Sequence, residues 1–267
     1  MKTRNRRDHI LPQVYLRGFI SPARKELAKP LWVFDVKSRA WSERSTKQVA
    51  WREGFYDYSS EGKPDATADE TFEELENRFP TLRNQILGEG FSSWTKHKDF
   101  LLRFGQMLRA RSPLFRKQHN AWTGNGGAKL SSQDPQRANE LSKNWAITDM
   151  RTEIKKGLAW FSNFDWALRF TMNPTDAIIT SDNPVIMEGN ALELESALGD
   201  SRTLIYFPLS WQMCLIGHHR QDIADTSEFP PDGLQHFRAL CARYTDQFLF
   251  SPTKQRIVDG TLGVNIE

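Results

Sequence analysis

Hydrophobic residues recur with a helical period through the middle of the chain. They are spaced at alternating steps of three and four, the repeat of one helix face, at Phe72, Leu75, Phe79, Leu82 and Ile86. Similar faces predict two more helices, over about 93–111 and 134–162. We expect Pro113 to bend or end the helix over 93–111, because the residue before a proline resists helical geometry.

Strand patterns lie on both sides of these helices. Residues 30–44 alternate in polarity around a "KSR" turn and predict a hairpin. Short runs rich in β-branched and aromatic residues predict further strands in the second half, with one helix among them: "DWALRFT", "AIITS", "TLIYFPL", "QMCLIG", "QFLFS" and the helix "DGLQHFRALCARY". The layout is therefore α+β, with an N-terminal arm and hairpin, central helices and a mainly antiparallel sheet from the C-terminal half. We find no internal repeat or linker and predict a single α+β domain over 1–267.

Composition favours a folded globule without a membrane partner. The 267 residues are 39% hydrophobic and 12% aromatic, which argues against disorder. Mean hydropathy is −0.60, and no apolar run approaches the roughly 20 residues that span a bilayer. The basic start lacks the apolar core of a secretory signal. Cys214 and Cys241 are too few for a disulfide framework, so we expect reduced thiols in a cytoplasmic protein.

The charge distribution permits an anionic partner. The net charge is +3 and the pI about 8.8. Lys and Arg concentrate in residues 1–52 and 96–117. A basic surface could face a nucleic acid or nucleotide, and scattered solvated charge explains the same numbers equally well. The sequence does not define an oligomeric state.

The opening stretch "RDHILPQVYLRGF" places several chemically able groups close together. Pro12 restricts the backbone, and apolar neighbours can pack the stretch onto a core, which would fix His9, Tyr15 and Arg17 in position. The alternative is a basic arm that caps the fold and has no chemistry of its own.

Arg111 falls near the middle of the apolar face of the helix over 93–111. A guanidinium there requires a carboxylate or a bound anion. Glu76 lies at the edge of the stripe on the preceding helix, whereas Glu70, Glu73 and Glu74 lie well away from it. We therefore predict a half-buried Glu76 that pairs with Arg111, and place this structural pairing slightly ahead of a direct substrate role for Arg111.

The stretch "AIITSDNPV" ends an apolar strand in Ser181, Asp182 and Asn183, followed by a proline. Polar groups at a strand end can be presented to a ligand from a rigid scaffold. The competing interpretation is a turn that merely stops the strand. The histidines of "GHHRQD" are expected at the surface. No Walker A loop, GxGxxG, HExxH, CxxC pair or GxSxG motif is present.

Taken together, these stretches resemble a mostly bacterial family known as domain of unknown function 4238. "HILPQVYLRGF" resembles its H-x-x-P-x-x-Y-L-x-x-F start, "STKQVAWREGFY" its S-x-K-x-V-A and F-Y segment, "RARSPLFR" its R-x-P-x-x-R segment, and "IITSDNPV" its S-D-N-P-V strand end. Asp8 departs from the pattern, where a second histidine often stands, which argues against a double-histidine metal site. The resemblance carries no activity, but it groups into one site His9, Tyr15, Arg17, Arg111, Arg116, Ser181, Asp182 and Asn183.

Our leading hypothesis from the sequence is a phosphodiester-cleaving enzyme, a nuclease acting on RNA or DNA. His9 would be the general acid or base. Asp182 would orient His9 or hold a divalent metal such as Mg²⁺ or Mn²⁺, although the sequence requires no metal. Arg111 would stabilise charge on the phosphate. A toxin or defence effector would suit such a chain.

The remaining residues of the group are assigned to substrate binding. Arg17 and Arg116 would contact phosphates, Tyr15 would stack on a base or donate a hydrogen bond, and Ser181 and Asn183 would complete the contacts. One alternative is a non-catalytic module that binds a nucleotide, a nucleic acid or a protein. Another is a purely structural network of Arg111, Glu76 and Asp182. All of these require the arm and the strand end to converge.

Overall fold

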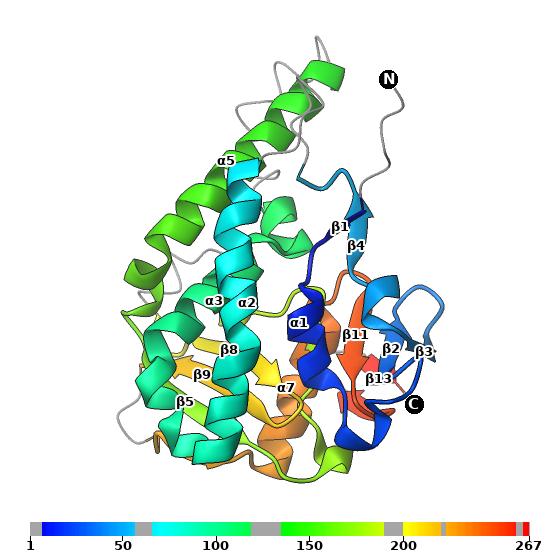
Figure 1. Cartoon of the computed structure of the whole chain (residues 1–267), viewed down its shortest axis with the longest axis vertical. Helices are drawn as coiled ribbons and strands as arrows, with labels where there is room; N and C mark the ends of the chain where they lie inside the picture. Colours follow the sequence, from blue (N-terminus) through cyan, green and yellow to red (C-terminus); the bar gives the residue numbers. More distant parts are fainter. Residues whose placement is uncertain are drawn as a thin grey trace.

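The structure is a computed structural model that describes residues 7–56, 66–118, 135–189, 200–219, 223–259 and 264–266. It confirms the α+β class, with helices in the middle of the chain and strands before and after them (Figure 1). Among the described helices, none combines the length and apolar character that crossing a membrane requires.

The larger sheet comes from the second half of the chain, as predicted, and has the strand order β10-β5-β9-β8-β7. Its neighbouring strands are antiparallel except for β10 and β5, which are parallel. The strands are β5 (Asp165–Phe170), β7 (Ile186–Glu188), β8 (Leu204–Ser210), β9 (Met213–His218) and β10 (Thr226–Glu228).

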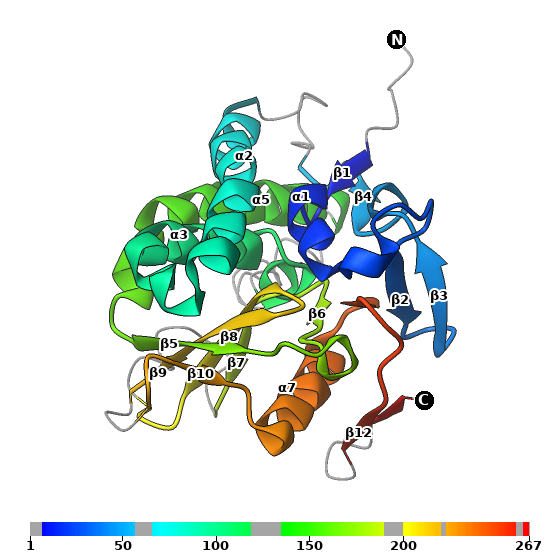
Figure 2. The same cartoon turned by 60° about the horizontal axis from the view of Figure 1, so that its bottom comes forward.

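Both faces of this sheet are covered. Figure 2 shows the long helices α2, α3 and α5 on one face and α7 on the other. Phe207 and Leu215 point into the core beneath the first group, whereas Tyr206 and Cys214 join the core beside α7. Adjacent strand residues face opposite ways, so both faces of β8 and β9 are covered and nearly all of their residues are buried. The helices are α2 (Ala66–Glu89), α3 (Lys98–Ala110), α5 (Pro135–Phe161) and α7 (Pro231–Tyr244).

The helices follow their predicted ranges with one change at the start of α3. Residues 91–97 form a 3₁₀ turn, so the α-helix begins at Lys98 and ends just before Arg111. Residues 113–118 are helical again after the break. Pro80 is accommodated inside α2.

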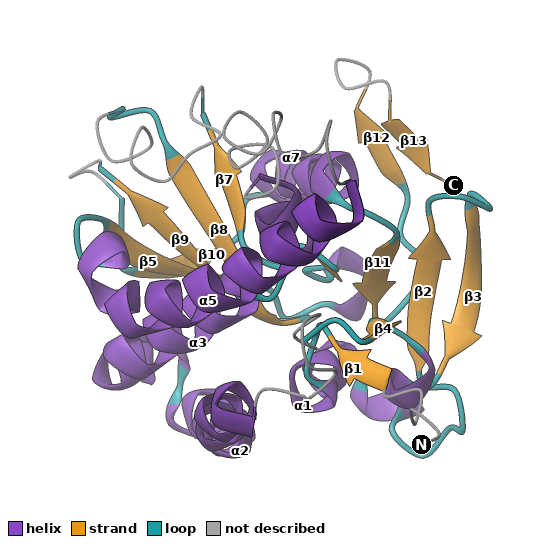
Figure 3. Ribbon diagram, turned by 90° about the horizontal axis from the view of Figure 1, so that it is seen from above, coloured by secondary structure: helices purple, strands orange, loops and turns teal. Residues whose placement is uncertain are grey.

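The smaller sheet joins the two ends of the chain. Its order is β3-β2-β11-β6, so the predicted hairpin pairs with a C-terminal strand (Figure 3). Two short antiparallel pairs, β1 with β4 and β12 with β13, lie outside it. The bounds are β1 (Arg7–His9), β2 (Leu31–Asp35), β3 (Ala40–Arg44), β4 (Trp51–Glu53), β6 (Thr180–Ser181), β11 (Phe248–Ser251), β12 (Ile257–Asp259) and β13 (Val264–Ile266).

The N-terminal arm is part of the core. After β1 it forms the short helix α1 (Gln13–Leu16) and a 3₁₀ turn at Arg17–Phe19. Leu11, Leu16 and Phe19 are fully buried. The apolar residues of "RDHILPQVYLRGF" therefore fix the backbone that carries His9 and Arg17.

The expected surface position of the two histidines is wrong. His218 is 3% exposed and His219 is half-buried, with its ring 4.3 Å from that of Phe164. The reason is that β9 is a central strand, hydrogen-bonded to β5 and β8 along its length.

Candidate functional site

The segment that follows α3, residues 111–118, contacts both halves of the predicted site. Arg111 caps α3 and donates to the N-terminal part of the chain, and Leu114 donates to the strand end at Asn183. The helix break at Arg111 and Ser112, just before Pro113, therefore lies between the arm and the S-D-N-P stretch.

Every nitrogen of the Arg111 guanidinium is engaged. Nη1 lies 2.5 Å from Glu76 Oε1, Nε donates to the Tyr56 hydroxyl at 2.6 Å, and Nη2 donates to the main-chain carbonyl of His9 at 2.6 Å. The group also lies over the Phe72 ring, 4.3 Å from its centroid. Arg111 is 4% exposed. The predicted pairing with a half-buried Glu76 is confirmed, and Arg111 holds α2, α3 and the arm together.

His9 is half-buried beside this network. Its Nε2 lies 3.4 Å from Gln13 Nε2. Burial, followed by the nearby positive charge of Arg111, lowers the pKa of His9 below its usual value. The imidazole is therefore mainly neutral at pH 7, the form in which it can accept a proton.

Arg116 retains free hydrogen-bonding capacity. Nη2 donates to the carbonyl of Phe55 at 2.6 Å, and Cζ lies 3.6 Å from the centroid of the Phe55 ring. Burial lowers the pKa of Arg116 to about 10, so the guanidinium stays charged at neutral pH. Within the described ranges, no carboxylate lies within ion-pair distance of it, whereas Arg52 pairs with Asp246.

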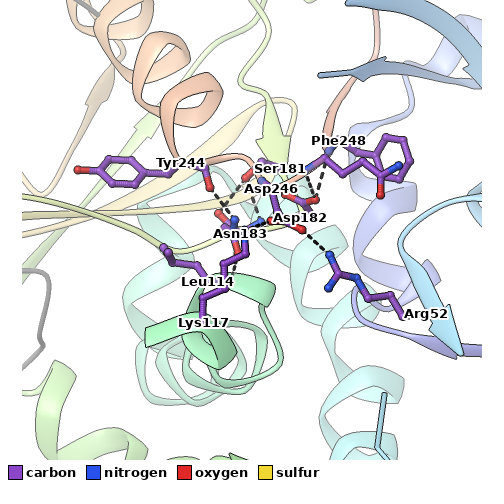
Figure 4. Close-up of polar contacts among 10 residues, drawn as sticks. Arg52, Leu114, Lys117, Ser181, Asp182, Asn183, Tyr244, Asp246 and Phe248 are labelled. Carbon is purple, nitrogen blue, oxygen red and sulfur yellow. Dashed lines mark hydrogen bonds and ion pairs between the residues drawn. The ribbon is translucent and has the colours of Figure 1, made fainter. Parts of the chain in front are cut away.

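The strand-end carboxylate of Asp182 is occupied by main-chain donors (Figure 4). Oδ1 accepts from the N–H of Asp246 at 2.9 Å, and Oδ2 accepts from those of Gln247 and Phe248 at 2.7 and 3.2 Å. Burial raises the pKa of Asp182 to about 6, against these three hydrogen bonds, which favour the charged form. The carboxylate ties β6 to the start of β11.

Ser181 and Asn183 also bond to the main chain. The Ser181 hydroxyl donates to the carbonyl of Asn183 and accepts from its N–H. The Asn183 amide accepts from Leu114 N–H at 2.8 Å and donates to the Tyr244 carbonyl at 2.6 Å (Figure 4). The three polar side chains of the motif thus join strand β6 to α7, β11 and the segment after α3.

Tyr15 has to be removed from the candidate site. It is 0% exposed, with its hydroxyl 2.9 Å from both Thr180 Oγ1 and the Pro208 carbonyl. A ring buried among Phe19, Phe79 and Phe104 cannot stack on a base. The prediction failed because Tyr15 lies on the inner side of α1.

Arg17 is exposed, and its positive charge acts on another cation, Arg83 of α2, whose pKa it helps to lower after burial. Arg83 is partly buried, and Nη1 has a long hydrogen bond, 3.4 Å, to the carbonyl of Val14. Neither guanidinium has a carboxylate within ion-pair distance among the described residues. This pair was not predicted, because the two arginines are far apart in sequence.

The N-terminal arm and the strand end at Asp182 are linked by ion pairs and backbone contacts. Among the described residues, they do not line a common recess. Asp8 lies opposite Arg52 in the β1–β4 pair, Arg52 pairs with Asp246, and Asp246 N–H donates to Asp182. Lys117, from the segment after α3, pairs with the same Asp246 (Figure 4). No cluster of three or more His, Cys, Asp or Glu side chains that could hold a metal ion occurs in the part of the chain that the structure describes.

A small recess lies beside the helix break, and it is lined by neither His9 nor Asp182. Its walls come from the end of α3, residues 112–118, Val185 with β7, and α7. The lining residues are Arg109, Ser112, Leu114, Phe115, Gln118, Val185, Met187 and Tyr244.

The sequence alone missed Tyr56, Asp246 and Arg109. Tyr56 had a signal, since it ends the "REGFY" segment. Asp246 had none, because its role depends on meeting Arg52 and Lys117 from distant segments. Arg109 falls off the apolar face of α3 on a helical wheel, yet it is buried because α5 supplies Glu153 on that side.

A family model described as a protein of unknown function (DUF4238) matches residues 7–254. Neither a curated protein nor a solved structure matches the chain.

Proposed function

The chain belongs to the DUF4238 family of proteins of unknown function, and from this premise we propose that it binds the phosphates of a nucleic acid through basic side chains beside the helix break. In this proposal the Arg111 and Asp182 networks are structural. The observation that carries the proposal is that the Arg116 guanidinium is charged and has little to neutralise it. It donates to one main-chain carbonyl, and no carboxylate lies within ion-pair distance of it in the described ranges.

The chemistry of Arg116 suits a phosphate oxygen. A guanidinium presents five N–H donors in a planar fork, and the hydrogen bond to Phe55 uses one of them. Stacking on the Phe55 ring fixes the plane of the group. Because it is partly buried, less solvent competes for its remaining donors.

Other cations with no carboxylate within ion-pair distance support a polyanionic ligand over a single small anion. Arg17 and Arg83 form a second basic pair, and the whole chain carries +3. Phosphate contacts by arginine and lysine supply most of the affinity for a nucleic acid independent of its sequence.

Phosphodiester cleavage is the second candidate, favoured by His9. Its half-buried, mainly neutral imidazole beside Arg111 is suited to a general base. It ranks second because the Asp182 carboxylate is 1% exposed and already accepts three main-chain hydrogen bonds, which suits a structural role better than binding a metal or orienting His9.

Fluorescence anisotropy with labelled single-stranded RNA and double-stranded DNA tests the binding proposal. We expect affinity that falls steeply with salt. Arg116→Ala should weaken binding about tenfold and reduce the salt slope by about one. The matched control is Arg103→Ala, which removes an exposed arginine from α3 and should leave affinity close to wild type. Equal binding by Arg116→Ala and wild type would refute the assignment.

The same nucleic acids, incubated with Mg²⁺, with Mn²⁺ or with a chelator, test cleavage. If the second candidate is correct, wild type cleaves and a folded His9→Ala variant does not. Salt-dependent binding with intact substrate in every condition favours the binding module. Undiminished cleavage by both His9→Ala and Asp182→Ala would rule out the catalytic scheme.

A further inference from the structure

We propose that the recess beside the helix break binds a small ligand through an anionic oxygen group, a carboxylate or a phosphate, held by Arg109. This site is separate from the arginines assigned to nucleic acid, and the proposal does not depend on that assignment.

Arg109 is a buried cation with an unmet donor. It is 9% exposed, at the end of α3. Its Nη1 has no hydrogen-bond acceptor among the described residues. The nearest carboxylate oxygen, Glu153 Oε2, lies 3.6 Å from Nη1, which satisfies an ion pair but is too long for a good hydrogen bond.

Glu153 is already engaged by a second side chain. Gln106, one turn before Arg109, donates from Nε2 to Glu153 Oε2 at 3.1 Å. This contact fixes the orientation of the Gln106 amide, since turning it would set its oxygen against the carboxylate. The Glu153 carboxylate is therefore held towards Gln106. It forms only a long ion pair with Arg109, so the positive charge of Arg109 is incompletely neutralised by α5.

Although Nη1 itself is buried beside Glu153, the Arg109 side chain also lines the recess. Ser112 and Gln118 add polar groups to the lining, and Phe115, with its ring centroid 5.3 Å from Arg109 Cζ, adds an aromatic surface. Leu114, Val185 and Met187 make the rest of the wall apolar. One convergent cation within an apolar and aromatic wall is the usual composition of a small-molecule site.

The S-D-N-P motif holds the recess open. The Asn183 amide bonds to Leu114 on one wall and to Tyr244 on another (Figure 4). Ser181 in turn fixes the backbone of Asn183. These bonds set the separation of the walls before any ligand arrives, which lowers the entropy lost on binding.

The size of the recess limits what enters it. Its volume is about 20 Å³, whereas a single water needs about 10–15 Å³ by this measure. An oxygen-bearing head group fits beside Arg109, and the remainder of the ligand lies outward against the apolar rim. The ligand class is therefore a small carboxylate or phosphate monoester with an apolar part.

Thermal unfolding at constant ionic strength tests this site, with sodium chloride replaced by phosphate, acetate, phenyl phosphate or benzoate. For wild type we expect a saturable rise in Tm, about 5–10 °C at a hundredfold excess over Kd. Phenyl phosphate or benzoate should saturate at lower concentration than the parent ion. A rise in Tm with phosphate and phenyl phosphate only identifies a phosphate head group. A rise with acetate and benzoate only identifies a carboxylate head group.

Variants separate the recess from general salt effects. Arg109→Met should lose the saturable rise, and Arg103→Met, a matched change at an exposed site of α3, should keep it. If Arg109→Met is too unstable, Arg109→Met combined with Glu153→Gln removes both charges, and Leu114→Trp fills the recess with Arg109 intact. Both should abolish the rise. A saturable rise that persists in these variants, or its absence from wild type with all four anions, overturns the proposal.

Discussion

The Asp182 carboxylate is 1% exposed and accepts three main-chain hydrogen bonds. Two physical effects oppose each other there, since burial disfavours the charge and the N–H donors favour it. Burial is the larger effect and raises the pKa of Asp182 from 3.8 to about 6. A group whose pKa is raised on folding contributes stability that is present below its unfolded pKa and is lost as the pH rises through its folded pKa.

We predict that the unfolding free energy of wild type, relative to Asp182→Asn, falls by about 2–3 kcal/mol between pH 4 and pH 7. The asparagine variant has no charge at this site, so the difference isolates the ionisation of Asp182. Urea unfolding across this pH range measures it. Asp165→Asn, at an exposed position on β5, should stay parallel to wild type. A difference that is flat or rises with pH would contradict the raised pKa.

Helix α3 is buried on most of its circumference. From Leu101 onward its residues are buried except Arg103. One side stacks Phe104 on Phe79 of α2, a second faces Phe207 of β8, and a third meets α5. Gly105 permits the approach to β8, because a Cβ placed there would lie 2.9 Å from the Phe207 ring.

We therefore predict that Gly105→Ala destabilises the protein by about 1–3 kcal/mol through overpacking, although alanine is the better helix former. Gly88→Ala is the matched control, because Gly88 is exposed in α2 and a Cβ there meets nothing within 4 Å. It should stabilise by about 0.5–1 kcal/mol. Denaturant unfolding measures both changes, and equal effects would show that backbone propensity, not packing, dominates at Gly105.

At the scale of the whole molecule, the two sheets share one core. Leu31 and Val33 of the hairpin belong to the same continuous apolar cluster as Phe207 and Leu215 of the larger sheet. The smaller sheet also pairs N-terminal β2 with C-terminal β11. The prediction of a single domain therefore implies that the two sheets unfold together.

We predict that Leu31→Ala and Leu215→Ala, at fully buried positions in the two sheets, each lower the midpoint of one common transition. Each should cost about 2–5 kcal/mol. Circular dichroism and tryptophan fluorescence should report coincident curves. Val36→Ala, at a partly exposed position beside β2, should have little effect. Separate transitions, one shifted by each variant, would indicate two units.

Local patterns were sufficient for the elements and for part of the site. The spacing of apolar residues predicted α2, α3 and α5. The strand-like runs predicted β5, β8 and β9 of the larger sheet, and also β6 and β11, which belong to the smaller one. The helical wheel also predicted the half-buried Glu76 and the buried Arg111, because the two residues lie on or beside apolar faces that must be covered. These inferences succeed because burial follows periodicity when one face of an element meets the core.

The sequence by itself determined the long helices, the hairpin and the main strands, and that Arg111 needs an anionic partner. Only the tertiary structure decided what the polar groups of the motifs do. Asp182 bonds to the backbone of residues 246–248, Tyr15 turns into the core, and Arg109 is buried because α5 covers a face that the wheel left to solvent. The physical reason is that periodicity reports one face of each element, whereas the partner of a polar side chain is set by segments distant in sequence that folding brings together.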